Sequence, residues 1–157
     1  KTVGIFYNSS EVNSEVQANQ AKQALEAKGV KVEVATVTST NDVQQTMTSL
    51  AAKVDAIYLP TDNTVASTAS TIGEILQEAK VPAMGSDAAV IDATLFTYGV
   101  DYHAIGVQAG ELAVKILKGD KPADLPVEKP NTAAVTVNEE MATALGFDAE
   151  TIKALEK

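Results

Sequence analysis

The sequence contains no cysteine, no arginine and no tryptophan, and it has only one histidine. Without cysteine, the chain can form no disulfide, no thiolate nucleophile, no zinc–thiolate site and no iron–sulfur cluster. The single histidine, His103, argues against a catalytic transition-metal site, whereas a carboxylate site for magnesium or calcium stays open. We therefore expect neither a resident metal nor a cofactor.

Positive charge is scarce as well. All 12 basic residues are lysines, and they stand against 21 acidic residues, which gives a formal net charge of −9. A nucleic-acid-binding protein needs a basic stripe along one face. Arginine, whose planar fork grips phosphates in two places, is missing altogether. The charge pattern therefore argues against DNA or RNA as a partner.

Long apolar runs are missing too. The first apolar run, Val3–Tyr7, is too short for the apolar core of a signal peptide or for a membrane span. The 157 residues, 45% of them hydrophobic and 21% charged, fit one globular domain. Because Lys1 leads straight into the apolar run, we expect either a mature chain or a piece of a longer one.

Two kinds of apolar pattern alternate along the chain, one typical of strands and one typical of helices. Short runs rich in strand formers occupy residues 2–7, 31–37, 56–59, 83–84, 96–100 and 133–137. Between them, apolar residues recur every three or four positions, as at Val65, Ala69, Ile72 and Leu76. This alternation predicts an α/β fold, a three-layer Rossmann-like sandwich with a mainly parallel sheet.

Boundary signals mark several of the predicted helices. Ser14-x-x-Gln17 predicts a capping box at the start of a first helix over about 14–28, and Gly29 predicts its end. Asn41 is expected to cap the second helix. Residues 119–131 hold three of the five prolines and predict an extended connector. Two short helices over 139–155, broken at Gly146, are expected to close the chain.

Four polar loops follow strands of the predicted sheet. Ligands of an open parallel sheet bind beyond the carboxyl ends of its strands. Free N–H groups at the start of each following helix suit a carboxylate, and the loop aspartates suit an ammonium, so together they suit a zwitterion. The candidate ligand-binding residues are Asn8, Ser9, Ser10, Asn13, Ser14, Thr61, Asp62, Asn63, Thr64, Ser86, Asp87, Asp101 and Tyr102.

The same residue types are also what helix N-caps require. For any one of these side chains, plain capping is therefore an alternative interpretation. The prediction of a site rests on four such loops meeting at one edge of the sheet, and not on any single loop.

Other protein families with this strand–helix order are excluded because the motifs that they need in these loops are missing. A phospho-accepting receiver domain needs an acidic pair after its first strand and a lysine after its fifth, but Tyr7-Asn8 ends the first strand and no lysine follows the fifth. The first loop lacks the glycine of a flavodoxin, and a dinucleotide loop, a P-loop and a nucleophile elbow are absent.

His103 lies at a predicted helix start, where a capping or surface role is simpler than catalysis. We expect no catalytic residue and no enzyme.

The loops and their strands resemble a known family. Val3–Ser14, Val54–Thr64, Val81–Asp87 and Tyr98–Tyr102 occur in the order and with the residues of the C-terminal lobe of ABC-transporter substrate-binding lipoproteins. These have the type I periplasmic-binding-protein fold, and the resemblance is to the branch that binds tryptophan and other aromatic amino acids. The resemblance covers all 157 residues but only the second half of such a protein.

This resemblance implies one lobe of a two-lobed protein that captures a small solute, an amino acid and more narrowly an aromatic one, in the cleft between its lobes. Its partners would be the ligand, the membrane permease of an ABC importer and the N-terminal lobe, which this sequence lacks. The location would be extracytoplasmic, at the cell surface or in the periplasm, with a lipid anchor upstream. The single ligand-binding lobe 1–157 would divide into core units (1–101), a helix that packs with the first lobe (102–118), a connector (119–132) and a closing strand with helices (133–157).

Two alternatives remain open at this point. The same fold serves as the effector-sensing domain of repressor-like regulators, which would carry a DNA-binding module upstream. In addition, the predicted helix over 103–117 has an apolar stripe at Ile105, Ala109, Leu112 and Ile116. Without the first lobe, we expect that stripe either to mediate self-association of the fragment or to dock back on its own lobe.

Overall fold

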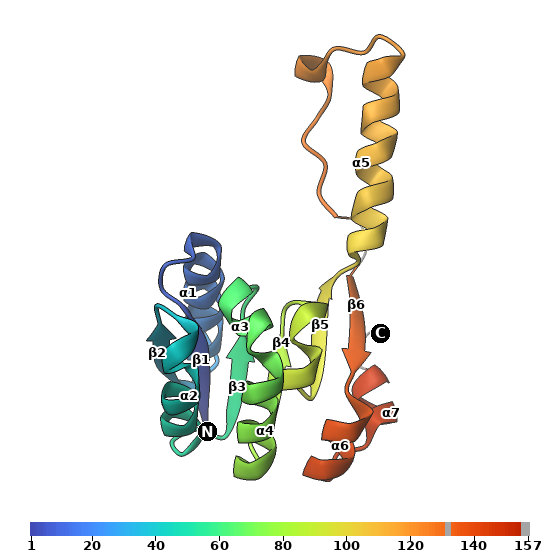
Figure 1. Cartoon of the computed structure of the whole chain (residues 1–157). Helices are drawn as coiled ribbons and strands as arrows, with labels where there is room; N and C mark the ends of the chain where they lie inside the picture. The colour runs from blue at the N-terminus through green and yellow to red at the C-terminus, as the bar shows by residue number, and fades with distance from the viewer. Residues whose placement is uncertain (131–132, 155–157) are drawn as a thin grey trace.

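Six short strands form one sheet in the computed structural model, which describes residues 1–130 and 133–154 (Figure 1). The strands are β1 (Thr2–Asn8), β2 (Lys31–Val37), β3 (Ala56–Leu59), β4 (Ala83–Gly85), β5 (Phe96–Val100) and β6 (Ala133–Val137). Their order across the sheet is β2-β1-β3-β4-β5-β6. Neighbours run parallel except β6, which pairs antiparallel with β5. The predicted α/β class with a mainly parallel sheet is confirmed.

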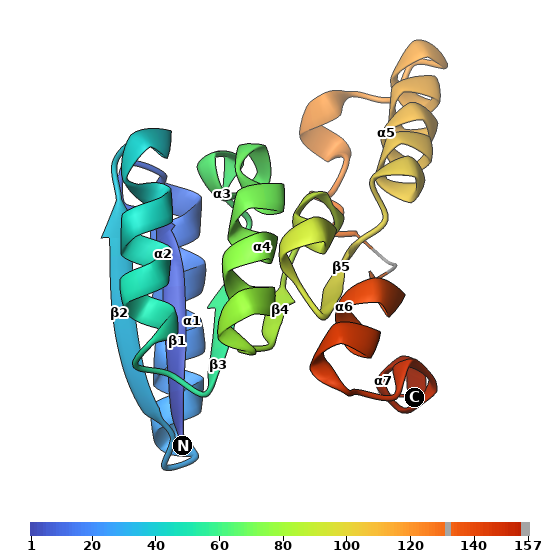
Figure 2. The ribbon, with the colours of Figure 1, turned by 60° about the horizontal axis from the view of Figure 1, so that its bottom comes forward.

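Helices cover both faces of this sheet. They are α1 (Val12–Ala27), α2 (Val43–Ala51), α3 (Asn63–Ser67), α4 (Ala69–Ala79), α5 (Tyr102–Leu117), α6 (Glu139–Leu145) and α7 (Ala149–Lys153). Short 3-10 turns occupy Thr40–Asp42, Ala88–Ala93 and Pro122–Asp124. Helices α2 and α4 lie on one face and α1 lies on the other (Figure 2), while α6 lies beside α4 and α7 packs against β6.

The larger core lies between the sheet and helices α2 and α4. Phe6 and Leu59 from the strands meet Met47, Ile72 and Leu76 from the helices, and all five are fully buried. Burial of each such side chain contributes about 1.5–3 kcal/mol. A smaller cluster on the opposite face holds α1 against β1. The two clusters fix the strands whose carboxyl ends carry the candidate site.

One predicted apolar stripe is buried but spans two helices. Val65 belongs to α3, whereas Ile72 belongs to α4, and Thr68 separates the two helices. The Thr68 hydroxyl donates to the carbonyl oxygens of Thr64, at 2.8 Å, and Val65, at 3.3 Å. Such bonds from a side chain to the preceding turn compete with regular helix, which accounts for the break.

The capping box predicted for α1 is wrong. The helix begins at Val12, its N-cap residue is Glu11, and no side chain caps it. Ser14 and Gln17 instead bond to the backbone of Thr61, which follows β3. These two polar side chains are therefore used for a tertiary contact, which local spacing along the chain could not reveal.

The cap predicted at Asn41 is also wrong. Asn41 lies inside the 3-10 turn Thr40–Asp42, so α2 begins two residues later at Val43. The Ser39 hydroxyl lies 3.3 Å from Asp42 Oδ2, which closes this turn ahead of the helix. The polar cluster therefore builds an additional turn in place of a single cap.

Two predicted helix ends are confirmed. Gly29 follows α1 with a φ of 75°, and Gly146 separates α6 from α7 with the same φ. This left-handed backbone is unfavourable for residues that carry a Cβ atom. The closing helix ends at Lys153; Leu155, to which the prediction extended, lies outside the described residues.

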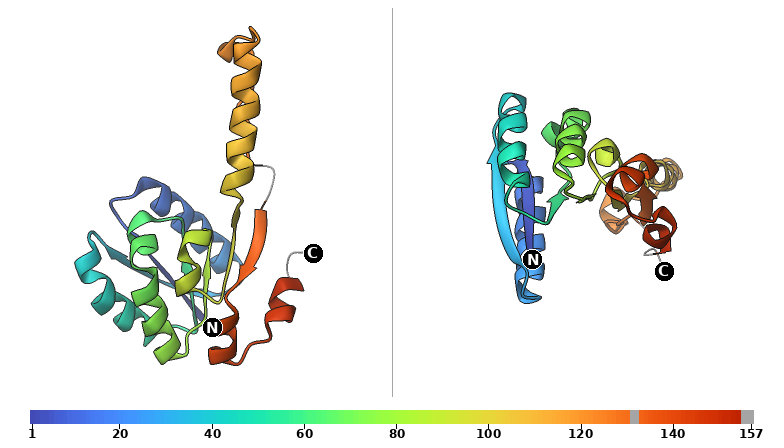
Figure 3. Two further views of the ribbon diagram at one scale, coloured as in Figure 1. Left: turned by 45° about the vertical axis from the view of Figure 1, so that its right-hand side comes forward. Right: turned by 90° about the horizontal axis from the view of Figure 1, so that it is seen from below.

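Helix α5 leaves the sheet and extends away from it (Figures 1 and 3). None of its sixteen residues, all of them described, is buried. The alternative in which this helix docks back on its own lobe is therefore wrong. Ile105 and Leu112 of the predicted stripe are half-buried, while Val107 and Val114 are about half exposed on the same helix.

The predicted connector runs back along α5. Gln108 Nε2 donates to Glu128 Oε2 at 2.8 Å and to the Lys129 carbonyl at 3.1 Å, and Lys115 Nζ lies 3.6 Å from Glu128 Oε1. The connector is extended apart from the 3-10 turn Pro122–Asp124. Residues 131 and 132 of the predicted connector lie outside the described residues.

Candidate functional site

The first turns of α1 and the loops after β3 and β4 are joined by hydrogen bonds that converge on Thr61. Its backbone N–H donates to Gln17 Oε1 at 3.0 Å, and its carbonyl accepts from Asn13 Nδ2 and Ser14 Oγ, both at 2.9 Å. Its hydroxyl lies 3.2 Å from the hydroxyl of Ser86, which also donates to Gln17 Oε1 at 3.1 Å. Four predicted residues, Asn13, Ser14, Thr61 and Ser86, are thereby brought together.

A second set of bonds joins β1 to α3. The Asp62 carboxylate accepts from the backbone N–H of Asn8 at 2.8 Å and of Val65 at 2.9 Å, one on each oxygen. Asn8 also donates through Nδ2 to Thr64 Oγ1 and accepts from the Ser10 N–H, both at 2.8 Å. Asp62 is 3% exposed and caps α3. The capping interpretation therefore describes the contacts that Asp62 makes in this structure.

Glu11 is a site residue that the sequence reasoning missed. Its carboxylate accepts from the backbone N–H and the side-chain amide of Asn63 at 3.0 Å each, and from the Thr64 N–H at 3.3 Å. Burial pushes the pKa of Glu11 upward, but these bonds outweigh it and the pKa is lowered. Its position as the one acid among the polar residues 8–14 was the available signal.

Asp87 and Tyr102 form a separate pair at the same edge. Asp87 is 8% exposed; its Oδ1 accepts from the Ala89 N–H at 2.8 Å and its Oδ2 accepts from the Tyr102 hydroxyl at 2.6 Å. The hydrogen bond to Asp87, followed by burial and the charge of Asp87, raises the pKa of Tyr102. Asp87 thus holds the side chain of a residue on the helix that leaves the lobe.

Two predicted residues lie at the margins of this arrangement. Asp101 Oδ1 accepts from the backbone N–H groups of His103, at 2.8 Å, and Ala104, at 3.1 Å, and so caps α5. The Ser9 N–H donates to the Val37 carbonyl at the end of β2. Neither is joined by a described hydrogen bond to the Thr61 network.

A groove runs from this edge down the sheet face beside α1. Its volume is about 920 Å³, and Gln17, Thr61 and Ser86 line it near the carboxyl ends of the strands. Tyr58, Met84, Tyr98 and Val100 from three strands, together with Leu25 from α1, make most of its remaining lining apolar. Of the predicted residues, only Thr61 and Ser86 are among its lining residues.

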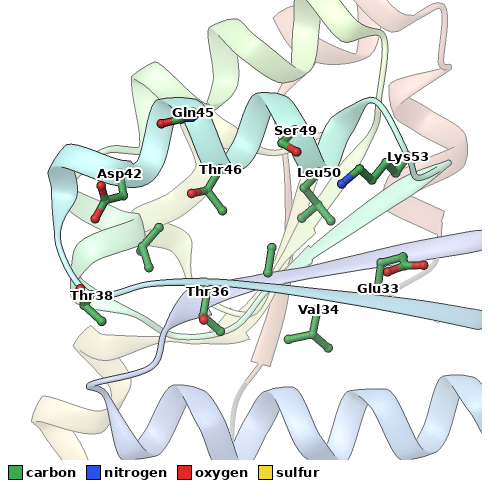
Figure 4. Close-up of a pocket in the computed structure, with 12 residues that line it drawn as sticks. Glu33, Val34, Thr36, Thr38, Asp42, Gln45, Thr46, Ser49, Leu50 and Lys53 are labelled. Carbon is green, nitrogen blue, oxygen red and sulfur yellow. The ribbon is translucent and has the colours of Figure 1, made fainter.

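A second cavity, of about 540 Å³, lies between β2 and α2 (Figure 4). Glu33 and Lys53 lie toward one end of it, and Thr38 and Asp42 lie toward the other. None of the predicted site residues is among its lining residues. It is therefore separate from the candidate site.

The described residues also limit the kinds of chemistry available. Within residues 1–130 and 133–154, no three His, Asp or Glu side chains gather closely enough to hold a metal ion. Among the helices of those residues, none is long and apolar enough to cross a membrane. What the edge offers is hydroxyl, amide and backbone groups together with carboxylates that already accept hydrogen bonds, a set suited to binding a polar solute.

Comparisons with known proteins agree with this chemistry. A family model described as ABC transporter substrate binding protein matches residues 1–153. A tyrosine-binding protein of Clostridioides difficile (strain R20291) is 31% identical over 146 residues, which cover 92% of this chain and 42% of that protein.

Solved structures give the same result. The ABC domain in complex with L-Trp from Streptococcus pneumonia is 39% identical with a TM-score of 0.85, over 97% of this chain and 52% of that one. The ligand-free, open structure of a substrate-binding protein with adhesive properties from Clostridium difficile is 38% identical with a TM-score of 0.77, over 94% and 50% of the two chains. The chain thus spans about half the length of the relatives it matches.

Proposed function

The chain belongs to the family of ABC transporter substrate-binding proteins, and on this premise we propose that it is the C-terminal lobe of a protein that captures an amino acid for import. The members of this family are binding proteins and not enzymes, so their function depends on recognising a ligand and closing the two lobes around it. The observation that carries the proposal is the convergence of the first turns of α1 and the loop after β4 on Thr61, which forms a polar edge beyond the parallel strands.

The ligand carboxylate is proposed to bind at the start of α1. This helix is 16 residues long and has no side-chain cap, so the N–H groups of its first turn are available to an anion. Glu11, the N-cap residue, is already compensated by the N–H donors of Asn63 and Thr64, whereas Glu15 lies within the first turn itself. With no arginine in the chain, backbone and hydroxyl donors must bind the carboxylate.

The ligand ammonium is proposed to bind Asp87. Both oxygens of Asp62 already accept backbone N–H groups, and Asp101 caps α5. Asp87 differs because its Oδ2 accepts only a side-chain hydroxyl, which can move aside or share the oxygen. An ammonium at Asp87 and a carboxylate at α1 would together select a zwitterion.

The class of amino acid follows from the relatives. One is called a tyrosine-binding protein, and another was solved in complex with L-Trp. Both support an aromatic amino acid as the ligand. No aromatic side chain takes part in the Thr61 network, but Tyr58 and Tyr98 line the adjoining groove, so a stacking contact would come from these rings or from the first lobe.

The whole protein is proposed to work by hinge closure of two lobes. Helix α5 and the connector would pack on the first lobe, which accounts for the exposure of Val107 and Val114. The closed form would deliver its ligand to an ABC permease on the extracytoplasmic side of the membrane, with a lipid anchor upstream. The family match favours this import function over the regulatory alternative.

The test is a thermal-shift screen of the two-lobed protein against the common amino acids, with D-arabinose as a sugar control. A ligand that binds only the folded state raises Tm with the logarithm of its excess over Kd. We expect L-tryptophan or L-tyrosine to give the largest rise. A rise with the sugar and none with any amino acid would contradict the proposal.

Produced without the first lobe, the 157-residue chain is expected to self-associate through the exposed apolar residues of α5. Light scattering measures this directly. Val107→Ser combined with Val114→Ser should restore a monomer, because both side chains are about half exposed. A wild-type chain that stays monomeric at high concentration would reject self-association.

A further inference from the structure

The crossing from β5 to α5 passes directly against the loop that follows β4. A Cβ atom at Gly99 would lie 2.8 Å from the Ser86 carbonyl oxygen and 3.3 Å from the Asp87 Cα atom. Two residues past the end of β5, the Tyr102 hydroxyl donates to Asp87 Oδ2 at 2.6 Å. The crossing is thus held at two points by a loop that also belongs to the candidate site.

Little else in the described residues holds α5 to the sheet. Its backbone N-terminus is capped by Asp101, and the polar side chains of Gln108 and Lys115 bond only to the connector. In the described part of the chain, the bond from Tyr102 is the one hydrogen bond that joins α5 to residues 1–100. Since none of the helix is buried, packing does not fix its direction.

We propose that the Tyr102–Asp87 hydrogen bond is a latch that sets the direction in which α5 leaves this lobe, and that ligand binding at Asp87 releases it. An ammonium is a stronger partner for a carboxylate than a neutral hydroxyl is. A ligand that takes Asp87 Oδ2 therefore weakens the bond to Tyr102 and frees the crossing segment. The release step rests on the proposed function, whereas the latch itself does not.

The latch is tested by a distance measurement on the 157-residue chain carrying Val107→Ser and Val114→Ser, the pair of changes expected to keep it monomeric. Because the chain has no cysteine, Glu111→Cys on α5 and Glu78→Cys on α4 provide two unique sites for spin labels. We expect a narrow distribution of label distances with Tyr102 present and a distribution about twice as wide in Tyr102→Phe, which keeps the ring and removes the hydroxyl.

Tyr98→Phe is the matched control. Tyr98 lies on β5, is 49% exposed and makes no described hydrogen bond through its hydroxyl, so its replacement should leave the distances unchanged. Circular dichroism confirms that both variants fold. Equal distributions for the wild type and Tyr102→Phe would overturn the latch.

The release step is tested on the two-lobed protein by calorimetric titration with L-tryptophan and with L-tyrosine. If ligand and latch compete for Asp87, Tyr102→Phe should bind about two- to tenfold more tightly than the wild type, the worth of one net hydrogen bond. An unchanged or lower affinity would overturn the release step. If the wild type binds neither amino acid, the proposed function and the release step fall together, while the distance measurement still decides the latch.

Discussion

Gln17 Oε1 accepts the backbone N–H of Thr61 at 3.0 Å and thereby ties the second turn of α1 to the end of β3. The same oxygen accepts the Ser86 hydroxyl. One side-chain amide of α1 therefore holds the loops after β3 and β4 in a fixed arrangement before any ligand arrives. Preorganisation of this kind reduces the entropy that binding must overcome.

Gln17→Met should destabilise the lobe by about 1–2 kcal/mol, because the part-buried Thr61 N–H loses its acceptor while the apolar volume is kept. Urea denaturation measures the change. Gln20→Met on the same helix is the control, since Gln20 is exposed and should change stability by less than about 0.5 kcal/mol. Equal effects for the two variants would show that the Thr61 contact is not stabilising.

Glu11 should make stability depend on acid pH. Its folded-state pKa lies below the ordinary value of 4.5, so its contribution is fully present above that value and is lost as the pH falls through the folded pKa. Glu11→Gln should therefore lower Tm at pH 7, and the difference should shrink as the pH falls below 4.5 and through the folded pKa. Thermal unfolding from pH 7 into the acid range gives the result, with the exposed Glu78→Gln as control. A difference that does not change with pH would argue against a charge effect of Glu11.

Tyr102 should ionise at a higher pH than an ordinary tyrosine. The hydrogen bond to Asp87 favours the neutral phenol, so the pKa is raised from 10.0. The corresponding stability is present below the ordinary value and is lost as the pH rises through the folded pKa. The difference between the near-ultraviolet titrations of wild type and Tyr102→Phe isolates this phenol. A midpoint at or below 10 would contradict the contact.

Two glycine substitutions should act in opposite directions. Gly99→Ala places a Cβ 2.8 Å from the Ser86 carbonyl and should destabilise by about 1–3 kcal/mol. Gly106→Ala on α5 meets no atom within 4 Å and should stabilise by about 0.5–1 kcal/mol, because alanine favours helix. Calorimetric melting of both variants tests the pair. A neutral Gly99→Ala would mean that the crossing is not tightly packed against the loop.

The strands could be predicted because each is a short run of β-branched or aromatic residues bounded by turn residues. All six lie within a residue or two of their expected positions. Helix starts were harder, since Ser14 and Gln17 have the right spacing for a cap but bond to Thr61, 44 or more positions away. A polar side chain chooses its partner by tertiary proximity, which periodicity does not encode.

The partners of the site residues were likewise not predictable from the sequence. Aspartates after strands were expected, but sequence alone could not separate Asp62, which is saturated by backbone donors, from Asp87, which holds a tyrosine hydroxyl. The contacts of Glu11 could not be predicted because its donors lie at the start of α3, more than fifty residues along the chain. The ligand-binding roles of all the candidate residues, Asp62 and Asp87 included, stay predictions.

The most direct test of the account compares L-tryptophan with indole-3-propionate, which keeps the ring and the carboxylate but lacks the ammonium. Isothermal titration calorimetry of the two-lobed protein should show saturable binding of the amino acid and an affinity at least about a hundredfold weaker for the analogue, the cost of leaving Asp87 without its charged partner. Equal affinity for the two compounds, or no binding of any amino acid, would contradict the proposal that this edge recognises a zwitterion.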